Sequence, residues 1–217
     1  MSEQTRNGPC PLCHAAPAPF AARQYFRCPD CALVFLDPAQ HPSPDEELAR
    51  YRQHRNSADD AGYIAFLSPL VQAVQQHAAE GATGIDFGCG PAPVLSQLLT
   101  AAGYPTAHYD PYFFPDASVL DRRYDFITCS EVAEHAFAPR QLFEQMRAFV
   151  EGGGIIAVST LLYDDVEDFA NWWYVRDSTH VSFYSAGTMQ WIAKHFGWTL
   201  TWPELHIALF SVPQSPA

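Results

Sequence analysis

The chain has 217 residues, 48% of them hydrophobic, and a formal net charge of −12 with a single lysine, Lys194. This size supports one full-sized hydrophobic core with a small additional module. The negative charge argues against broad nucleic-acid binding, so we expect a small-molecule partner. No apolar run reaches the roughly 18 to 20 residues of a membrane helix, and the N-terminus lacks the residue order of a signal peptide, so we expect a cytoplasmic protein.

Four of the six cysteines form two C-x-x-C pairs near the N-terminus, in "CPLC" and "CPDC". In a chain without a secretion signal, this spacing favours a metal over disulfides. Each pair can direct two thiolates at one tetrahedral Zn²⁺. The sequence therefore predicts a zinc ribbon over residues 1–40 with a structural Zn²⁺; the alternative is four reduced cysteines in a core. The four are Cys10, Cys13, Cys28 and Cys31.

Residues 41–61 are rich in proline and polar side chains, which predicts a linker entering a short helix and a domain boundary. The next stretch, 62–81, has apolar residues at helical spacing and ends at Gly81, so it predicts an amphipathic helix that starts or breaks near Pro69. The second domain is expected to span residues 62–217.

From there, strands and helices alternate. "TGIDFGCG", "PTAHYDP", "YDFITCS" and "GIIAVSTL" predict buried strands, while "APVLSQLLTAAG" and "PRQLFEQMRAFVEGGG" predict helices that stop at glycines. This alternation is typical of a doubly wound, mostly parallel sheet with helices on both faces. A last helix, "SAGTMQWIAKHFG", precedes two strand-like runs around a Pro-containing turn, which predicts an antiparallel C-terminal hairpin.

Ligands of such sheets bind beyond the carboxyl ends of the strands. Asp86 lies on the first strand, and Gly88 and Gly90 follow in a turn that permits close backbone approach to a nucleotide-like ligand. Asp110 ends the second strand, twenty residues beyond Gly90, where a carboxylate is suited to accept hydrogen bonds from both ribose hydroxyls. The alternative reading of Asp110 is a turn or N-cap residue before Pro111.

The motifs "GIDFGCGPAPVL", Asp110, "YDFITCSEVAEH" and "FVEGGGIIAVST" resemble, in order, those of class I S-adenosylmethionine-dependent methyltransferases. The resemblance implies a seven-stranded Rossmann-like sheet. It also implies that Asp86, Gly88 and Gly90 line the methionine side of the cofactor, that Asp110 holds its ribose, and that Cys129 and Ser130 pass beneath the reaction centre. An NAD-binding domain is the rival interpretation, but its G-x-G-x-x-G fingerprint requires glycine where Pro93 stands.

The segment "SEVAEH" follows what would be the fourth strand of that family pattern. Glu131 and Glu134 are three residues apart, the spacing that shares one face of a helical turn, and His135 comes next. Such a set suits Mg²⁺, Mn²⁺, Fe²⁺ or Zn²⁺. An ordinary acidic helix start, favoured by the helix dipole and capped by Ser130, is the alternative.

A polar and aromatic loop, "NWWYVRDSTHVSFYS", follows the fifth strand and contains His180. The pattern E-x-x-E-H with a later histidine resembles the metal-dependent branch of the superfamily, which implies that Glu131, Glu134, His135 and His180 are ligands of a second divalent ion. His180 is alternatively a general base or a hydrogen-bonded loop residue. Catalytic roles are assigned to Glu134, His135 and His180, and candidate substrate contacts are Trp172, Trp173, Tyr174, Arg176 and Asp177.

Three functions are compatible with these residues. The first is transfer of a methyl group from S-adenosylmethionine to a small-molecule hydroxyl, assisted by a metal or by a histidine base. The second is methylation of carbon, nitrogen or sulfur on a sugar or another metabolite, with a histidine as the base. The third is a non-catalytic module whose zinc ribbon binds a partner. The acceptor and the oligomeric state are left open.

Overall fold

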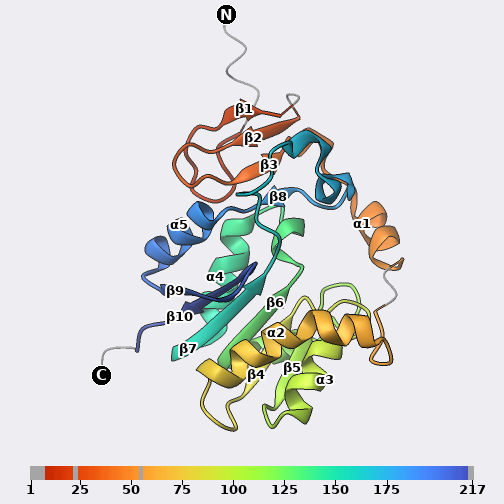
Figure 1. Cartoon of the computed structure of the whole chain (residues 1–217), viewed down its shortest axis with the longest axis vertical. Coiled ribbons are helices and arrows are strands. Elements are labelled where there is room, and N and C mark those ends of the chain that lie inside the picture. Colours follow the sequence, from red (N-terminus) through yellow and green to blue (C-terminus); the bar gives the residue numbers. More distant parts are fainter. Residues whose placement is uncertain (1–7, 22–23, 54–55, 215–217) are drawn as a thin grey trace, which may run out of the picture.

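Six strands form the larger of two sheets in the computed structural model, which describes residues 8–21, 24–53 and 56–214 (Figure 1). Their order across the sheet is β5-β4-β6-β7-β10-β9. The first four are parallel, whereas β10 is antiparallel to β7 and β9, which confirms the predicted C-terminal hairpin. The bounds are β4 Gly84–Phe87, β5 Thr106–Tyr109, β6 Tyr124–Ser130, β7 Val150–Ser159, β9 Thr199–Glu204 and β10 Ile207–Ser211.

The expectation of seven strands was wrong by one. Between β5 and β6 the chain forms a turn, with Asp110 bridged to Phe114, and then the short 3₁₀ helix η3 (Ala117–Asp121). A parallel return needs a crossover of about a dozen residues. Residues 110–123 leave no room for two crossovers with a strand between them, so β5 becomes the edge of the sheet.

Helices cover both faces of this sheet. The apolar cluster on one face includes residues of α2 (Ala61–His77) and α3 (Val94–Ala101), and the cluster on the other face includes residues of α4 (Pro139–Phe149) and α5 (Ala186–Phe196). The neighbours of β4 are β5 on one side and β6 on the other, so the strand order reverses there. Ligands of open α/β sheets bind at such a reversal.

Three local expectations need correction. Pro69 neither starts nor breaks α2, which runs through it from its Asp60 cap. The glycines after α4 do not stop a helix, because α4 ends at Phe149 and residues 152–154 belong to β7. Glycine is needed at position 154 for close strand packing, since a Cβ there would lie 2.6 Å from the Asp125 carbonyl oxygen. Pro203 lies within β9 rather than in the turn, as edge strands allow.

The smaller, antiparallel sheet has the order β1-β2-β3-β8. Three of its strands come from the cysteine-containing segment: β1 Ala18–Phe20, β2 Tyr25–Arg27 and β3 Val34–Leu36. The fourth, β8 (Ser182–Phe183), comes from the polar loop after β7, so two distant parts of the sequence share one sheet (Figure 1). The predicted linker contains α1 (Pro44–Tyr51), which begins at a Ser43–Glu46 capping box.

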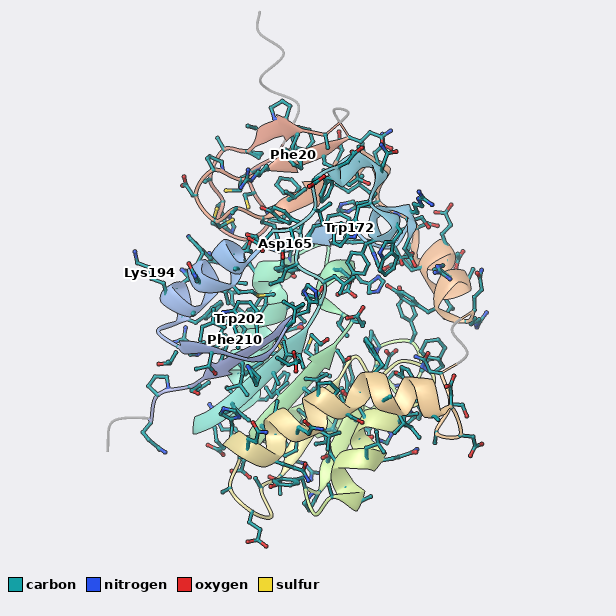
Figure 2. All side chains as sticks on the ribbon, viewed as in Figure 1. Phe20, Asp165, Trp172, Lys194, Trp202 and Phe210 are labelled. Atoms are coloured by element: carbon teal, nitrogen blue, oxygen red, sulfur yellow. The ribbon has the colours of Figure 1, made fainter. Side chains whose placement is uncertain are left out.

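The remaining short helices are η2 (Pro38–Gln40), η4 (Ala133–His135), η5 (Phe169–Asn171) and η6 (Trp173–Arg176). Lys194 is exposed and points away from α5 (Figure 2). Over the described ranges, none of the helices combines the length and apolarity needed to cross a membrane.

Candidate active site

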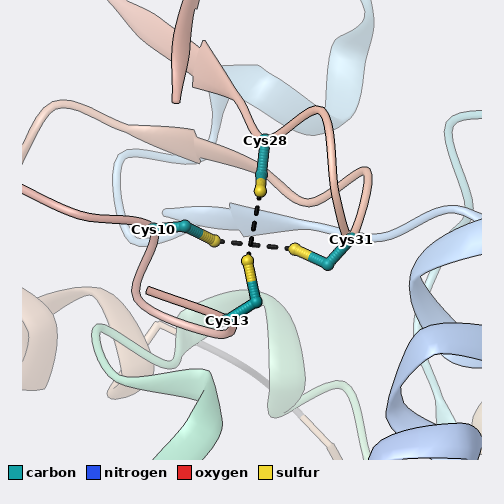
Figure 3. Close-up of side chains that lie close together, drawn as sticks. All are labelled: Cys10, Cys13, Cys28 and Cys31. Atoms are coloured by element: carbon teal, nitrogen blue, oxygen red, sulfur yellow. Dashed lines mark hydrogen bonds between the residues drawn. The ribbon is translucent and has the colours of Figure 1, made fainter. Parts of the chain in front are cut away.

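The four N-terminal cysteines converge on one point (Figure 3). Their Sγ atoms lie 3.6 Å apart for Cys10 and Cys31 and 3.2 Å apart for Cys13 and Cys28. Both C-x-x-C turns have the same backbone hydrogen bonds. The carbonyl oxygen of the first cysteine accepts from the N–H four residues later, and the N–H of that cysteine donates to the carbonyl oxygen five residues later. A hydrogen bond with the neighbouring Cys31 thiol lowers the pKa of Cys10, which favours the thiolate form that binds metal. Four such sulfurs suit a closed Zn²⁺ site.

A cavity of about 620 Å³ opens beyond the carboxyl ends of β4, β5 and β6. It brings together most of the residues selected from the sequence. Cys129 is fully buried and does not line it, and neither does exposed Arg176. The predicted residues that do line it are Asp86, Gly88, Gly90, Asp110, Ser130, Glu131, Glu134, His135, Trp173, Tyr174, Asp177 and His180.

The glycine turn forms one end of the cavity. Gly88 and Gly90 have φ values of +82° and +66°, in the left-handed region that favours glycine. A Cβ on Gly88 would lie 2.4 Å from Val132 Cγ2, whereas a Cβ on Gly90 would meet no atom within 4 Å. Gly88 is thus required by packing, and Gly90 leaves open space beside its backbone.

Two buried carboxylates flank this turn. Asp110 accepts hydrogen bonds from the Gly90 N–H on Oδ2 at 3.0 Å and from two N–H groups of its own turn on Oδ1. Asp86 accepts from the Thr128 hydroxyl at 3.0 Å, yet burial raises the pKa of Asp86 to about 7. A cationic group in this half of the cavity would therefore stabilise the ionised form of Asp86.

At the other end, Glu134, His135 and His180 place one ligand atom each within 4.8 Å of one another. His135 Nδ1 lies 3.0 Å from the Thr179 carbonyl oxygen, and His180 Nδ1 lies 2.8 Å from that of Tyr174. A carbonyl only accepts, so both Nδ1 atoms must donate, which leaves the lone pair on each Nε2. A hydrogen bond from one ring nitrogen to a carbonyl oxygen is what orients a histidine that binds a metal through its other ring nitrogen.

The carboxylate of Glu134 is completely buried. Oε2 accepts from the Thr160 hydroxyl at 2.8 Å. Among the residues that the structure describes, Oε1 has no hydrogen-bond partner, and His135 Nε2 lies 4.0 Å from it. Burial raises the pKa of Glu134 and lowers that of His180. An unsatisfied buried carboxylate oxygen costs several kcal/mol unless a cation or proton compensates it, so this set fits a divalent ion.

Glu131 does not share a helical face with Glu134, contrary to the expectation from their spacing. Its backbone is left-handed, with φ of +50°, its N–H donates to the Ser159 carbonyl, and the 3₁₀ helix begins only at Ala133. Its carboxylate is outside the three-residue set and accepts from Tyr174 Oη at 3.5 Å. Burial and the neighbouring Glu134 carboxylate raise the pKa of Glu131 to about 9.

Sequence reasoning missed the contribution of α1, because a short helix in a polar segment looks like a linker. Glu47 and Tyr51 line the cavity, and Glu47 accepts from Tyr51 Oη and Tyr112 Oη, both at 3.1 Å. The Tyr51 ring packs edge-on against His135, with centroids 5.2 Å apart. Only the capping box and the tyrosine itself were visible in the sequence.

Two predicted substrate contacts have other partners. Asp177 accepts a hydrogen bond from Arg50 on α1, and the distance from Arg50 Nη2 to Asp177 Oδ2 is 2.6 Å. Burial raises the pKa of Asp177, but the hydrogen bonds from Arg50 and Thr179 outweigh it and hold that pKa below its usual range. Trp172 packs on Phe169 and Tyr174, in the apolar cluster that includes Phe183 of β8, and it does not line the cavity. Trp173, by contrast, lines the cavity and is 64% exposed.

Comparison with known proteins places these features in a family. A family model described as a methyltransferase domain matches residues 29–201. A search of curated proteins found no match. A solved 1,6-didemethyltoxoflavin-N1-methyltransferase from Burkholderia thailandensis, with bound 1,6-didemethyltoxoflavin and S-adenosylhomocysteine, aligns with a TM-score of 0.55 at 13% identity, over 91% of this chain and 99% of that one.

An O-methyltransferase family protein from the same organism aligns with a TM-score of 0.54 at 11% identity, over 82% of this chain. This chain spans 66% of that protein and 53% of a coclaurine N-methyltransferase. Such likenesses show the fold, and the family match covers most of the sequence. The chain therefore belongs to the methyltransferase-domain family, and it shares the fold of these solved methyltransferases.

Proposed function

We propose that this methyltransferase transfers the methyl group of S-adenosylmethionine to a hydroxyl of a small molecule, with a divalent ion at Glu134, His135 and His180 and a structural Zn²⁺ in the ribbon. The observation that carries the metal is the buried, unpartnered Oε1 of Glu134 beside two imidazoles whose Nδ1 atoms both donate to carbonyls. One carboxylate and two imidazoles leave coordination positions open for acceptor oxygens.

The cofactor would lie at the glycine turn. Asp110 lines the cavity beside Gly90, where its carboxylate would accept from ribose hydroxyls, and Asp86 would lie near the cationic methionine end. Ser130, the last residue of β6, lines the same cavity. The transferred methyl group would therefore lie between the carboxyl ends of β4 and β6.

The reaction is an in-line displacement. The acceptor oxygen forms a bond to the methyl carbon while the carbon–sulfur bond breaks, and its electron pair stays on sulfur to give S-adenosylhomocysteine. A bound divalent ion would orient the acceptor hydroxyl and lower its pKa, so that its proton would be released to solvent as the bond to carbon forms. Glu134, held by Thr160, and the two histidines, held by Thr179 and Tyr174, keep the donor atoms fixed, so that positioning contributes to the rate.

The test is methyl transfer from S-adenosylmethionine to catechol, a probe with two adjacent hydroxyls, in protein that keeps its ribbon zinc but has been stripped of other metal. We expect methylated catechol to form only after Mn²⁺ or Mg²⁺ is added back. Calorimetry should show that the protein binds S-adenosylhomocysteine both with and without that ion. Full turnover of catechol in the stripped protein would instead support hydroxyl methylation without the second metal, in which His135 or His180 accepts the proton.

A further inference from the structure

The ribbon and the proposed metal site are joined by two consecutive backbone hydrogen bonds. The Leu36 N–H, at the end of β3, donates to the Val181 carbonyl at 2.8 Å, and the Val181 N–H donates to the Glu134 carbonyl at 2.8 Å. Val181 is 1% exposed, so each bond is shielded from water. These two bonds link a ribbon strand to the residue that carries the unpartnered carboxylate.

The segment around Val181 also carries the second histidine. His180 directly precedes it, and the Thr179 carbonyl accepts from His135 Nδ1. On the far side, the Ser182 hydroxyl donates to the Ala136 carbonyl at 2.8 Å, and Phe35 of β3 pairs with Ser182. Residues 179–182 are therefore held between the ribbon sheet and η4, and all three metal-site residues depend on their position.

Side-chain packing reinforces this connection. Three ribbon cysteines and Phe35 belong to the same apolar cluster as Phe143 of α4 and fully buried Tyr184. Tyr184 Oη donates to the Ala133 carbonyl at 3.0 Å, at the start of η4. The ribbon is thus continuous with the core on that face and is not a separately tethered module.

The cofactor half is supported differently. Gly88 N–H donates to the Tyr109 carbonyl, Gly90 N–H donates to Asp110, and Thr128 donates to Asp86, so β4, β5 and β6 hold it among themselves. None of these bonds involves the ribbon. A disturbance of the ribbon should therefore reach one half of the cavity before the other.

We propose that the zinc ribbon positions the metal-binding half of the active site, through the connection from Leu36 across Val181 to Glu134, and leaves the cofactor half unaffected. This inference rests on the proposed function for its two metals. It assigns to the ribbon a role beyond stabilising its own fold: loss of its zinc would release the strand that fixes His180 and Glu134.

Two variants test it. Leu36→Pro removes the N–H that donates to Val181 and leaves all four cysteines in place, and Ala18→Pro, in outer strand β1, is the matched control. In Leu36→Pro we expect Mn²⁺ affinity at the second site to fall about 10-fold or more, in the range for lost supporting contacts. S-adenosylhomocysteine affinity should stay within about two-fold in both variants, as separate support of the two halves requires.

Hydrogen exchange gives a readout that does not require the second metal. With the full chain, Cys13→Ser should lose the ribbon zinc, and the Val181 amide should then exchange about 10-fold faster or more, as in local unfolding. Unchanged Val181 protection in zinc-free protein, or equal Mn²⁺ affinities in Leu36→Pro and Ala18→Pro, would overturn the inference. If wild-type protein binds no second ion, the metal of the proposed function fails, while Val181 exchange still decides this inference.

Discussion

Replacing Glu134 by glutamine is expected to lower Mn²⁺ affinity by about 100-fold or more and to slow catechol methylation at least as much. The reason is that Oε1 is buried without a hydrogen-bond partner, and an amide at this position supplies no negative charge to a cation. The measurement is Mn²⁺ titration of protein saturated with S-adenosylhomocysteine, followed by product formation.

The matched control for this change is Glu131→Gln. Glu131 is a second carboxylate on the same segment and lines the same cavity, but it is outside the three-residue ligand set. We expect its Mn²⁺ affinity to change by no more than about three-fold, because no ligand is lost. Equal losses in the two variants would contradict the assignment of Glu134 as the carboxylate ligand and would bring Glu131 into the site.

Replacing Asp110 by asparagine is expected to weaken S-adenosylhomocysteine binding by about 30-fold or more, since hydrogen bonds to a charged acceptor contribute about 1.5–3 kcal/mol each. An asparagine Oδ1 can still accept from the Tyr112 and Phe113 N–H groups, so the turn is largely kept. Calorimetry measures the affinity, and thermal unfolding shows whether the variant is folded.

Asp116→Asn serves as the control for Asp110→Asn. Asp116 accepts from the Ser118 N–H in the next turn and does not line the cavity. Its S-adenosylhomocysteine affinity should match that of wild type. A folded Asp110→Asn variant with wild-type affinity would remove Asp110 from the cofactor site and leave it as a turn residue, the alternative reading from the sequence.

Much of the fold follows from local patterns. Buried strands ended by glycines and alternating with amphipathic helices predict a parallel sheet covered on both faces, and the short connection before β10 predicts an antiparallel pair. The absence of a seventh strand was not predicted, because the family resemblance implies seven strands, whereas residues 110–123 are too few for two crossovers with a strand between them.

The sequence predicts most residues of the candidate site but not the hydrogen bonds and strand pairing that hold them in position. Asp86 lies near the end of a predicted strand, and Gly90, Asp110, Glu134 and His135 lie at or beyond strand ends, so the sequence predicts all five at one edge of the sheet, where the cavity lies. The pairing of β3 with β8 and the Nδ1 bonds of the two histidines are contacts between segments far apart in sequence, and no local pattern encodes them.

The central claim is that a divalent ion is held by Glu134 and two histidines beside the cofactor. The most direct measurement is the metal content of protein bound to S-adenosylhomocysteine and equilibrated with Mn²⁺, on wild type and on His135→Ala with His180→Ala. The account predicts one zinc and one manganese in wild type, and one zinc alone in the double variant. One zinc in both, with S-adenosylhomocysteine bound equally, would contradict it and leave the ribbon as the metal site.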